Sequence, residues 1–142
     1  MTVQTIADVE FGAEIEAFRP DTSLTATSEF ADAVGWGDGG GRFSDHALAR
    51  EQGLPGALVP GLLTLGFLTT MIHRWAPAGR VVSVDTVFRA PLLADSQVEL
   101  SAVVTDIDED TGAVEIDLSA KNEKGETGVF GTATLMLPVA AG

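Results

Sequence analysis

The sequence contains no cysteine among its 142 residues, and only eight lysines and arginines stand against 21 aspartates and glutamates. Without cysteine the fold holds no disulfide and no thiol carries catalysis, which favours a cytoplasmic setting. The formal net charge of −13 opposes attraction to DNA, RNA or an anionic bilayer. Nucleic acid and membranes are therefore not expected partners.

Long uninterrupted apolar runs are also missing. The most apolar stretch, residues 54–72, is interrupted by two prolines and three glycines, so it does not predict a membrane-spanning helix. The first twelve residues have neither a basic region nor an apolar run, and no signal peptide is expected. With 45% hydrophobic residues, the chain is expected to fold as a single domain spanning residues 1–142.

Residues 60–76 predict a long central helix. Pro60 suits a first helical turn, Pro77 suits a stop, and apolar residues recur between them at helical spacing. Further apolar residues widen this stripe until the helix is expected to be buried nearly all round. Two short helices are expected before it. One spans residues 25–35 with Thr27 or Ser28 as its cap, and one runs from Ser44 or Asp45 to Gly53.

Four runs rich in β-branched residues follow, at residues 80–90, 97–107, 112–122 and 128–137. The third run alternates, with one face made of Val114, Ile116, Leu118 and Ala120. Residues 1–23 predict an irregular arm or one strand. The order of elements predicts an α+β domain in which an antiparallel sheet with one wet face curls around the central helix.

This arrangement resembles the hot-dog fold, and the local sequence resembles its MaoC-like branch, which includes (R)-specific enoyl-CoA hydratases and 3-hydroxyacyl thioester dehydratases. The resemblance covers roughly residues 28–137. Four segments carry it: GWGDGGGRFSD, ALVPGLLTLGFL, VDTVFRAPLLADSQVEL and KNEKGETGVFGTATLMLP. It implies a hydratase or dehydratase activity on an acyl thioester, without a cofactor.

The resemblance also implies a site. Catalytic members pair an aspartate with a histidine in the motif D-x-N-P-I-H-x-D, and the backbone N–H of a glycine at the start of the central helix stabilises the thioester oxyanion. Carried onto this chain, the first aspartate falls on Asp38, the last on Asp45, and the glycine on Gly61.

The chain departs from that pattern at the histidine position, which holds Phe43. Phenylalanine transfers no proton, and general acid-base catalysis is worth on the order of 100- to 10,000-fold in rate. Glycines replace the Asn-Pro pair, and the helix begins with Val59-Pro60-Gly61 in place of A-H-G. An alternative alignment places Trp36 at the aspartate position and leaves Phe43 unchanged.

His46 offers one replacement for the missing imidazole, working with Asp38 as the second catalytic residue while Arg42 orients a carboxylate. In the alternative interpretation Asp45 caps a helix, His46 faces solvent and Arg42 forms a structural salt bridge. Both stay open at the level of sequence.

The arginines allow two interpretations as well. Arg89, with Arg74 and Arg80, would meet the phosphates of coenzyme A or form structural salt bridges. The candidate substrate-binding residues are Arg42, Phe43, Asp45, Val59, Pro60 and Arg89.

No metal site is expected. His73 is expected to be an ordinary residue at the end of the central helix, and the acidic run at 106–110 is expected to be a hairpin turn. The glycine-rich loop lacks the lysine and the hydroxyl residue of a phosphate loop.

Two functions therefore remain. The chain is an enoyl-CoA hydratase or 3-hydroxyacyl-CoA dehydratase with Asp38, Gly61 and His46 as its catalytic residues. Alternatively, it is a non-catalytic hot-dog subunit that shapes the acyl tunnel of a catalytic partner, as in heteromeric dehydratases of steroid side-chain breakdown. Either implies a homodimer or heterodimer. The acyl chain, the pathway and the choice between coenzyme A and acyl carrier protein stay open.

Overall fold

The computed structural model describes residues 2–36 and 39–139. Its helical segments are η1 (Ile6–Asp8), α1 (Leu24–Ala33), η2 (Gly39–Gly41), α2 (His46–Glu51) and α3 (Gly61–Trp75). Its strands are β1 (Glu14–Phe18), β2 (Arg80–Phe88), β3 (Glu99–Asp108), β4 (Ala113–Lys121) and β5 (Thr127–Met136). The four strands predicted from β-branched runs are confirmed, and β1 lies within the predicted N-terminal arm.

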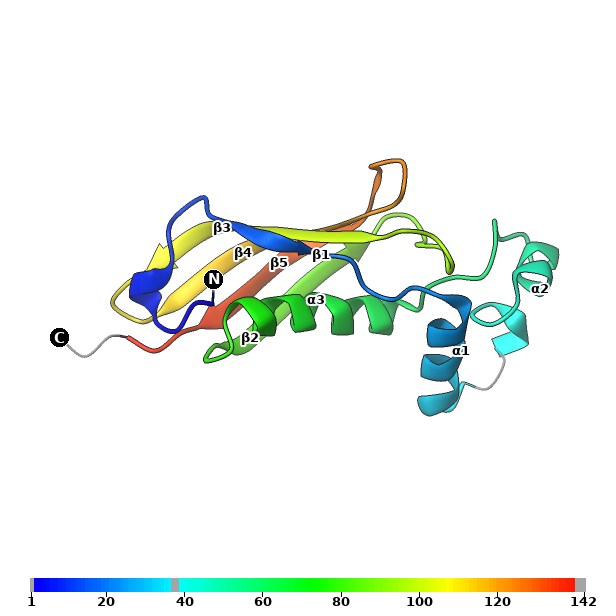
Figure 1. The fold of residues 1–142 in the computed structure, drawn as a ribbon, viewed down its shortest axis with the longest axis horizontal. Helices are drawn as coiled ribbons and strands as arrows, with labels where there is room; N and C mark the ends of the chain where they lie inside the picture. The colour runs from blue at the N-terminus through cyan, green and yellow to red at the C-terminus, as the bar shows by residue number, and fades with distance from the viewer. Residues whose placement is uncertain (1, 37–38, 140–142) are drawn as a thin grey trace.

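Within the described ranges, the strands form one antiparallel sheet in the order β1-β3-β4-β5-β2. Helix α3 lies along one face of this sheet, while α1 and α2 extend beyond the sheet near the start of α3 (Figure 1). The predicted α+β architecture is therefore confirmed. No helix in the described part of the chain is long and apolar enough to cross a membrane.

The main core lies between α3 and the sheet. The alternation predicted for β4 is confirmed, because Val114, Ile116, Leu118 and Ala120 are buried while their neighbours are more exposed. They belong to the same apolar cluster as Leu68 of α3. Burying each large apolar side chain contributes roughly 1.5–3 kcal/mol, which holds the helix against the sheet.

The burial predicted for α3 differs from the structure. The helix extends from Gly61 to Trp75, close to the predicted 60–76, but its fully buried residues are Thr64, Leu68, Met71 and Ile72. Leu62 is 55% exposed. The sheet covers one side of the helix in the protomer, so the expectation of burial nearly all round was wrong.

The start of α1 also differs from the prediction. The helix begins at Leu24, and the Ser23 hydroxyl caps it by accepting the Ala26 N–H at 3.2 Å. Thr27 lies inside the helix and is buried, so it is not the cap. Serine and threonine are both favoured as N-cap residues, so the sequence alone does not decide between them. The backbone decides, because it is non-helical at Ser23 and helical at Thr27.

Candidate functional site at the start of the central helix

A pocket of about 340 Å³ lies at the start of α3. Its largely apolar lining comes from Arg42 and Phe43, from Leu58, Val59, Gly61 and Thr64, from residues 88–92, and from Val129. The structure thus brings together five residues that the sequence singled out: Arg42, Phe43, Val59, Gly61 and Arg89. Pro60 lies between two of them as the N-cap of α3.

The start of α3 leaves backbone N–H groups without intrahelical partners. Pro60 has no N–H and gives no side-chain cap. The amides of the first turn, beginning with Gly61, have no carbonyl one turn earlier to bond, and the helix dipole makes this end partly positive. A carbonyl oxygen that gains negative charge would be stabilised there.

Gly61 also permits a close packing contact. A Cβ added to Gly61 would lie 3.2 Å from two carbon atoms of the Phe88 ring. Phe88 is the last residue of β2 and lines the same pocket. Any larger residue at position 61 would therefore have to displace the Phe88 ring.

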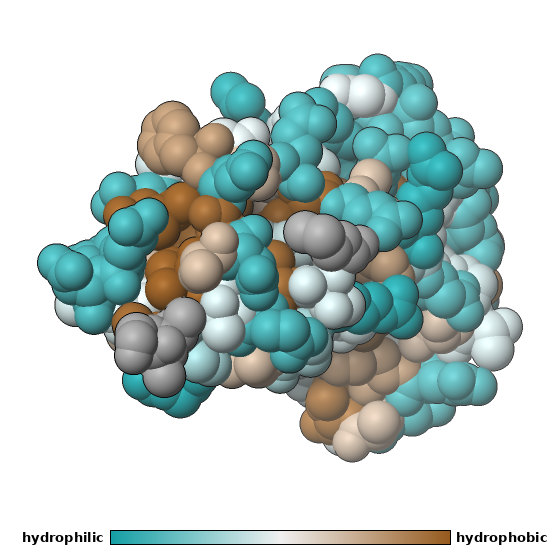
Figure 2. Space-filling view, turned by 60° about the vertical axis from the view of Figure 1, so that its left-hand side comes forward, coloured by the Kyte–Doolittle hydropathy of each residue, from teal (hydrophilic) through white to brown (hydrophobic). Residues whose placement is uncertain are grey.

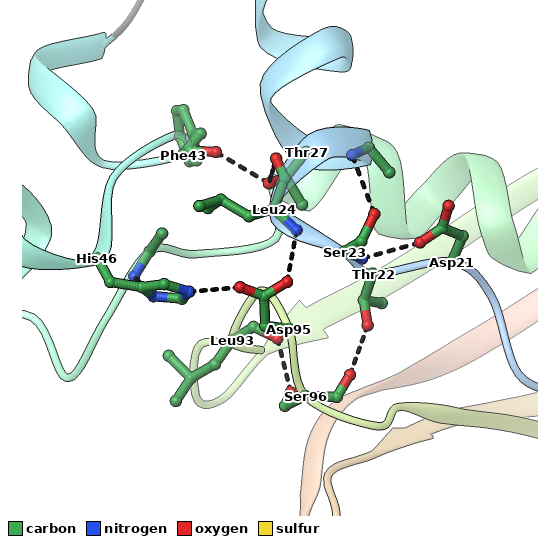
Figure 3. A network of polar contacts seen from close by, with 12 residues as sticks. Asp21, Thr22, Ser23, Leu24, Thr27, Phe43, His46, Leu93, Asp95 and Ser96 are labelled. Atoms are coloured by element: carbon green, nitrogen blue, oxygen red, sulfur yellow. Dashed lines mark hydrogen bonds and ion pairs between the residues drawn. The ribbon is translucent and has the colours of Figure 1, made fainter.

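Phe43 belongs to an aromatic cluster that continues away from the pocket. The centroid of its ring lies 5.4 Å from that of the Trp36 ring. The Trp36 ring in turn makes an edge-to-face contact with Phe30 of α1, with 5.9 Å between the ring centroids. The Thr27 hydroxyl donates to the Phe43 carbonyl at 2.9 Å (Figure 3). The position that the resemblance assigns to a catalytic histidine is thus an apolar, packed corner.

Two guanidinium groups stand at the same pocket. Arg42 and Arg89 are exposed, and neither side chain forms an ion pair or hydrogen bond with any of the described residues. By contrast, Arg19 pairs with Glu99 at 2.8 Å. In a chain of net charge −13, two unpaired cations beside an apolar pocket favour an anionic group on its ligand.

The His46 side chain is fully engaged by protein partners (Figure 3). Its Nδ1 accepts the Ala57 N–H at 3.0 Å, and its Nε2 lies 2.8 Å from a carboxylate oxygen of Asp95. Because Nδ1 accepts, the ring proton is on Nε2, which donates to Asp95. The ring keeps no lone pair for a substrate or water proton, and His46 is not among the residues lining the pocket.

Asp95 is a site residue that sequence reasoning missed. One carboxylate oxygen accepts the Leu24 N–H at 2.8 Å, and the other faces His46. Hydrogen bonding from His46 first, and then from the Leu24 amide, holds the pKa of the Asp95 carboxyl below its usual value of 3.8. Asp95 lies 49 residues from its partner, and no local motif marks it.

The remaining candidates lie as follows. Asp45 caps α2, where its carboxylate accepts the Leu48 N–H at 3.1 Å. Asp38 lies outside the described residues. His73 lies in the last turn of α3, as predicted, and is exposed. The acidic run at 106–110 leads into the turn between β3 and β4, and the described residues contain no cluster of metal-binding side chains.

A larger hollow of about 630 Å³ lies at the opposite end of α3. It is lined by Val9, Phe18, Met71 and Trp75, by several acidic residues, and by Arg74, one of the arginines considered from the sequence. Figure 2, which turns the end with both termini forward, shows apolar surface recessed among hydrophilic residues. The Arg74 guanidinium lies over the Phe18 ring, 4.5 Å from the ring centroid, so its charge is directed at an aromatic face of this hollow.

Solved structures with the same fold are numerous. The R-hydratase PhaJ1 from Pseudomonas aeruginosa matches with a TM-score of 0.85 at 19% identity, over 96% of this chain and 86% of that one. A chain of the ChsH1-ChsH2 complex from Mycobacterium tuberculosis matches with a TM-score of 0.79 at 21% identity, over 91% and 98%. A MaoC-like dehydratase from Rhodospirillum rubrum matches with a TM-score of 0.80 at 15% identity, over 98% and 99%.

These likenesses establish the hot-dog fold in the form found in MaoC-like dehydratases and (R)-hydratases. The fold expected from the sequence is thereby confirmed. No protein-family model matches the chain, and no curated protein matches it either. At these identities the fold alone is shared, so function has to be argued from the pocket.

Proposed function

We propose that this chain binds an acyl thioester as the non-catalytic subunit of a hydratase or dehydratase, in which a partner hot-dog chain supplies the proton-transfer histidine. The observation that carries this proposal is the lining of the pocket at the start of α3. Among the described residues, it contains apolar side chains, Thr64 and two arginines, but no carboxylate and no imidazole.

The pocket fits the parts of an acyl thioester. The acyl chain would lie against the apolar lining around Phe43 and Phe88, and the thioester carbonyl would accept the Gly61 N–H. The phosphates of the carrier, coenzyme A or acyl carrier protein, would meet Arg42 and Arg89 at the pocket. This assignment gives Phe43, Phe88, Gly61, Arg42 and Arg89 one role each in binding.

The described residues that line the pocket include no carboxylate or imidazole for proton transfer. Hydration of an enoyl thioester needs a base to take a proton from water and an acid to protonate the α-carbon. Phe43 does neither, and the His46 ring is occupied by Ala57 and Asp95. A histidine from a second chain supplies the missing function most simply.

The edge of the sheet formed by β2 is available for pairing with a partner chain. Strand β2 pairs with β5 on one side and stands at the edge of the described sheet. Its side chains Val82, Val87 and Phe88 are each about half exposed. Unpaired edge strands with apolar side chains favour pairing with another strand. The similarity to a chain from the ChsH1-ChsH2 complex is consistent with a heteromeric assembly.

Loss of the enoyl thioester absorbance tests the proposal. We expect no turnover of crotonyl-CoA or of a bulkier enoyl-CoA by the pure chain, and turnover when a hot-dog chain with the intact aspartate and histidine motif is added. Mutating the histidine of that added chain should abolish the activity. Turnover by the chain alone, lost in Asp38→Asn, would instead establish a complete enzyme.

A pair of variants at Gly61 tests the binding mode. Gly61→Pro removes the N–H at a helix position that tolerates proline, while Gly61→Ala adds a comparable Cβ and keeps the N–H. One hydrogen bond contributes about 0.5–1.5 kcal/mol, so we expect binding of a non-reactive acyl-CoA thioester analogue that keeps its carbonyl to be roughly 2- to 12-fold weaker in Gly61→Pro than in Gly61→Ala. Equal affinities by calorimetry would refute the proposed carbonyl contact.

A further inference from the structure

The wall of the pocket depends on three segments that meet around His46. Residues 57–59 run between residues 42–46 and residues 92–95, and backbone hydrogen bonds tie them to both neighbours. On one side, the Leu58 N–H donates to the Arg42 carbonyl at 2.8 Å. Because residues from all three segments line the pocket, a shift of any one segment would change its shape.

Val59 and Leu92 anchor two of these segments in the main core, but apolar packing is lighter in the part that surrounds His46. The buried residues of the cluster between them are Ala49, Ala57 and Ala94, with Leu24 and Leu54 packed against it. Alanine side chains bury little apolar area, so this cluster contributes far less than the core under the sheet. Polar contacts therefore have a large share in fixing the parts of these segments that lie around His46.

His46 and Asp95 connect all three segments and α1 (Figure 3). The His46 ring, on the first segment, accepts the Ala57 N–H of the second and donates to Asp95 of the third. Asp95 also accepts the N–H of Leu24, the first residue of α1. Each bond uses a different atom, so the two side chains hold four parts of the chain at once.

The backbone of Asp95 supports a specific role. Its φ is +62°, and within residues 2–36 and 39–139 it is the one non-glycine residue with positive φ. Side chains disfavour this left-handed region, although aspartate and asparagine tolerate it better than most. Glycine would adopt the same turn without strain, but glycine has no carboxylate to offer His46.

We propose that His46 and Asp95 are a positioning pair that fixes the pocket wall, with Asp95 holding the His46 ring in the tautomer that accepts the Ala57 N–H. This inference rests on the proposed function in one respect, namely that the wall fixed by the pair is the surface that binds the acyl thioester. His46 then acts through Ala57 and Leu58 and does not touch the substrate.

Protonation of the ring gives this role a distinct signature. A doubly protonated ring turns Nδ1 into a donor, which cannot accept the Ala57 N–H. Among the described residues, Asp95 is the charged group in contact with the ring, and Asp45 on the adjoining helix turns its carboxylate to Leu48. A doubly protonated ring would therefore lower the protection of the Ala57 amide, which is its exchange rate compared with that of an unstructured peptide at the same pH.

The experiment uses the full chain and the variant Asp95→Asn. Asparagine tolerates positive φ, and its amide oxygen still accepts the Leu24 N–H. Its NH₂ group, however, donates to Nε2, which then has to carry the lone pair and leave the proton on Nδ1, facing the Ala57 N–H. Nitrogen NMR of the imidazole reports the tautomer, and amide hydrogen exchange reports Ala57 and Leu58.

We expect the wild type to show the Nε2–H tautomer and slow exchange at both amides. In Asp95→Asn the ring should lose that tautomer, and both amides should exchange at least tenfold faster. The matched control is Asp21→Asn, because Asp21 accepts the Ser23 N–H in the same region without contacting His46. This control should behave as the wild type does.

Two results would overturn the positioning pair: a wild-type ring that carries its proton on Nδ1, or an Asp95→Asn variant whose Ala57 and Leu58 amides stay as protected as before. Neither measurement needs a ligand. Titration with S-hexyl-CoA then tests the link to function, and we expect binding about tenfold weaker in Asp95→Asn than in Asp21→Asn. If the wild type does not bind this thioether, the proposed function is wrong, but the exchange data still show whether His46 and Asp95 position the pocket wall.

Discussion

The side chains at the start of α3 divide into those that face the pocket and those that hold its walls. Phe43 and Arg89 line the pocket. His46, although it lies three residues after Phe43, is turned toward Ala57 and Asp95. The lone pair of the His46 ring is therefore already bonded, and the ring is not available to take a proton from a ligand.

Another carboxylate with a structural role is Asp8, at the end of η1. It accepts the N–H groups of Gln4 and Thr5 at 3.0 Å each, and these bonds lower the pKa of its carboxyl below 3.8. A lowered pKa in the folded state contributes stability above the unfolded value, and that contribution is lost as the pH falls through the folded value.

We therefore predict that Asp8→Asn is less stable than the wild type near pH 6, and that this difference shrinks as the pH falls below 3.8. Urea unfolding midpoints at each pH measure it. The control is Glu10→Gln, because Glu10 is nearby and exposed and its carboxylate makes no hydrogen bond with the described residues. This variant should leave the unfolding midpoint unchanged at each pH. A difference that stays constant with pH would contradict the prediction.

The residues of the site show how far sequence reasoning reaches. Gly61 and Phe43 were placed at the pocket because a motif carries them in a fixed order along the chain. Asp95 was missed because its partner is 49 residues away and its positive φ arises from the fold of the loop after β2. Contacts of this kind are set by tertiary structure, which local patterns do not encode.

Among the elements, strands β2 and β5 leave no room for a side chain at Gly131. Gly131 pairs with Thr86, and a Cβ added to it would overlap the Asp85 carbonyl oxygen and lie 2.8 Å from the Thr86 Cα. Backbone atoms cannot move aside as a flexible side chain does. The glycine therefore lets β2 pack tightly against its neighbour.

The same substitution at two glycines should have opposite effects. Gly131→Ala should destabilise the fold by roughly 1–3 kcal/mol, because it forces β2 away from β5. Gly66→Ala should stabilise it by roughly 0.5–1 kcal/mol, because Gly66 lies within α3 with open space around it and alanine favours helix. Urea unfolding of both variants tests this, and a neutral Gly131→Ala would show that the two strands separate without cost.

The elements themselves were largely predictable. Helix α3 and the last four strands follow from spacing that a single segment contains, and their predicted ranges agree with the structure. The exposure of Leu62 did not follow, because an apolar stripe records which side chains avoid water but not what covers them. That exposed face agrees with the proposal of a partner chain.

At the scale of the whole molecule, charge is strongly unbalanced. The net charge is −13, and Arg19–Glu99 is the one arginine or lysine ion pair within residues 2–36 and 39–139. Its side chains are 74% and 42% exposed, so it contributes little to stability. Repulsion among surface carboxylates therefore outweighs specific attraction in the folded protein.

Added salt should consequently stabilise this protein. Raising NaCl from about 10 to about 150 mM shortens the screening length from about 30 to about 8 Å, which weakens repulsion between distant carboxylates. We expect the thermal midpoint at pH 7 to rise by about 2–5 °C in a fluorescence melt. The control is the same pair of salt concentrations near pH 4.2, where the sequence carries no net charge, and there the rise should vanish. A midpoint that falls with salt at pH 7 would mean that ion pairs, and not net repulsion, dominate the electrostatics of the fold.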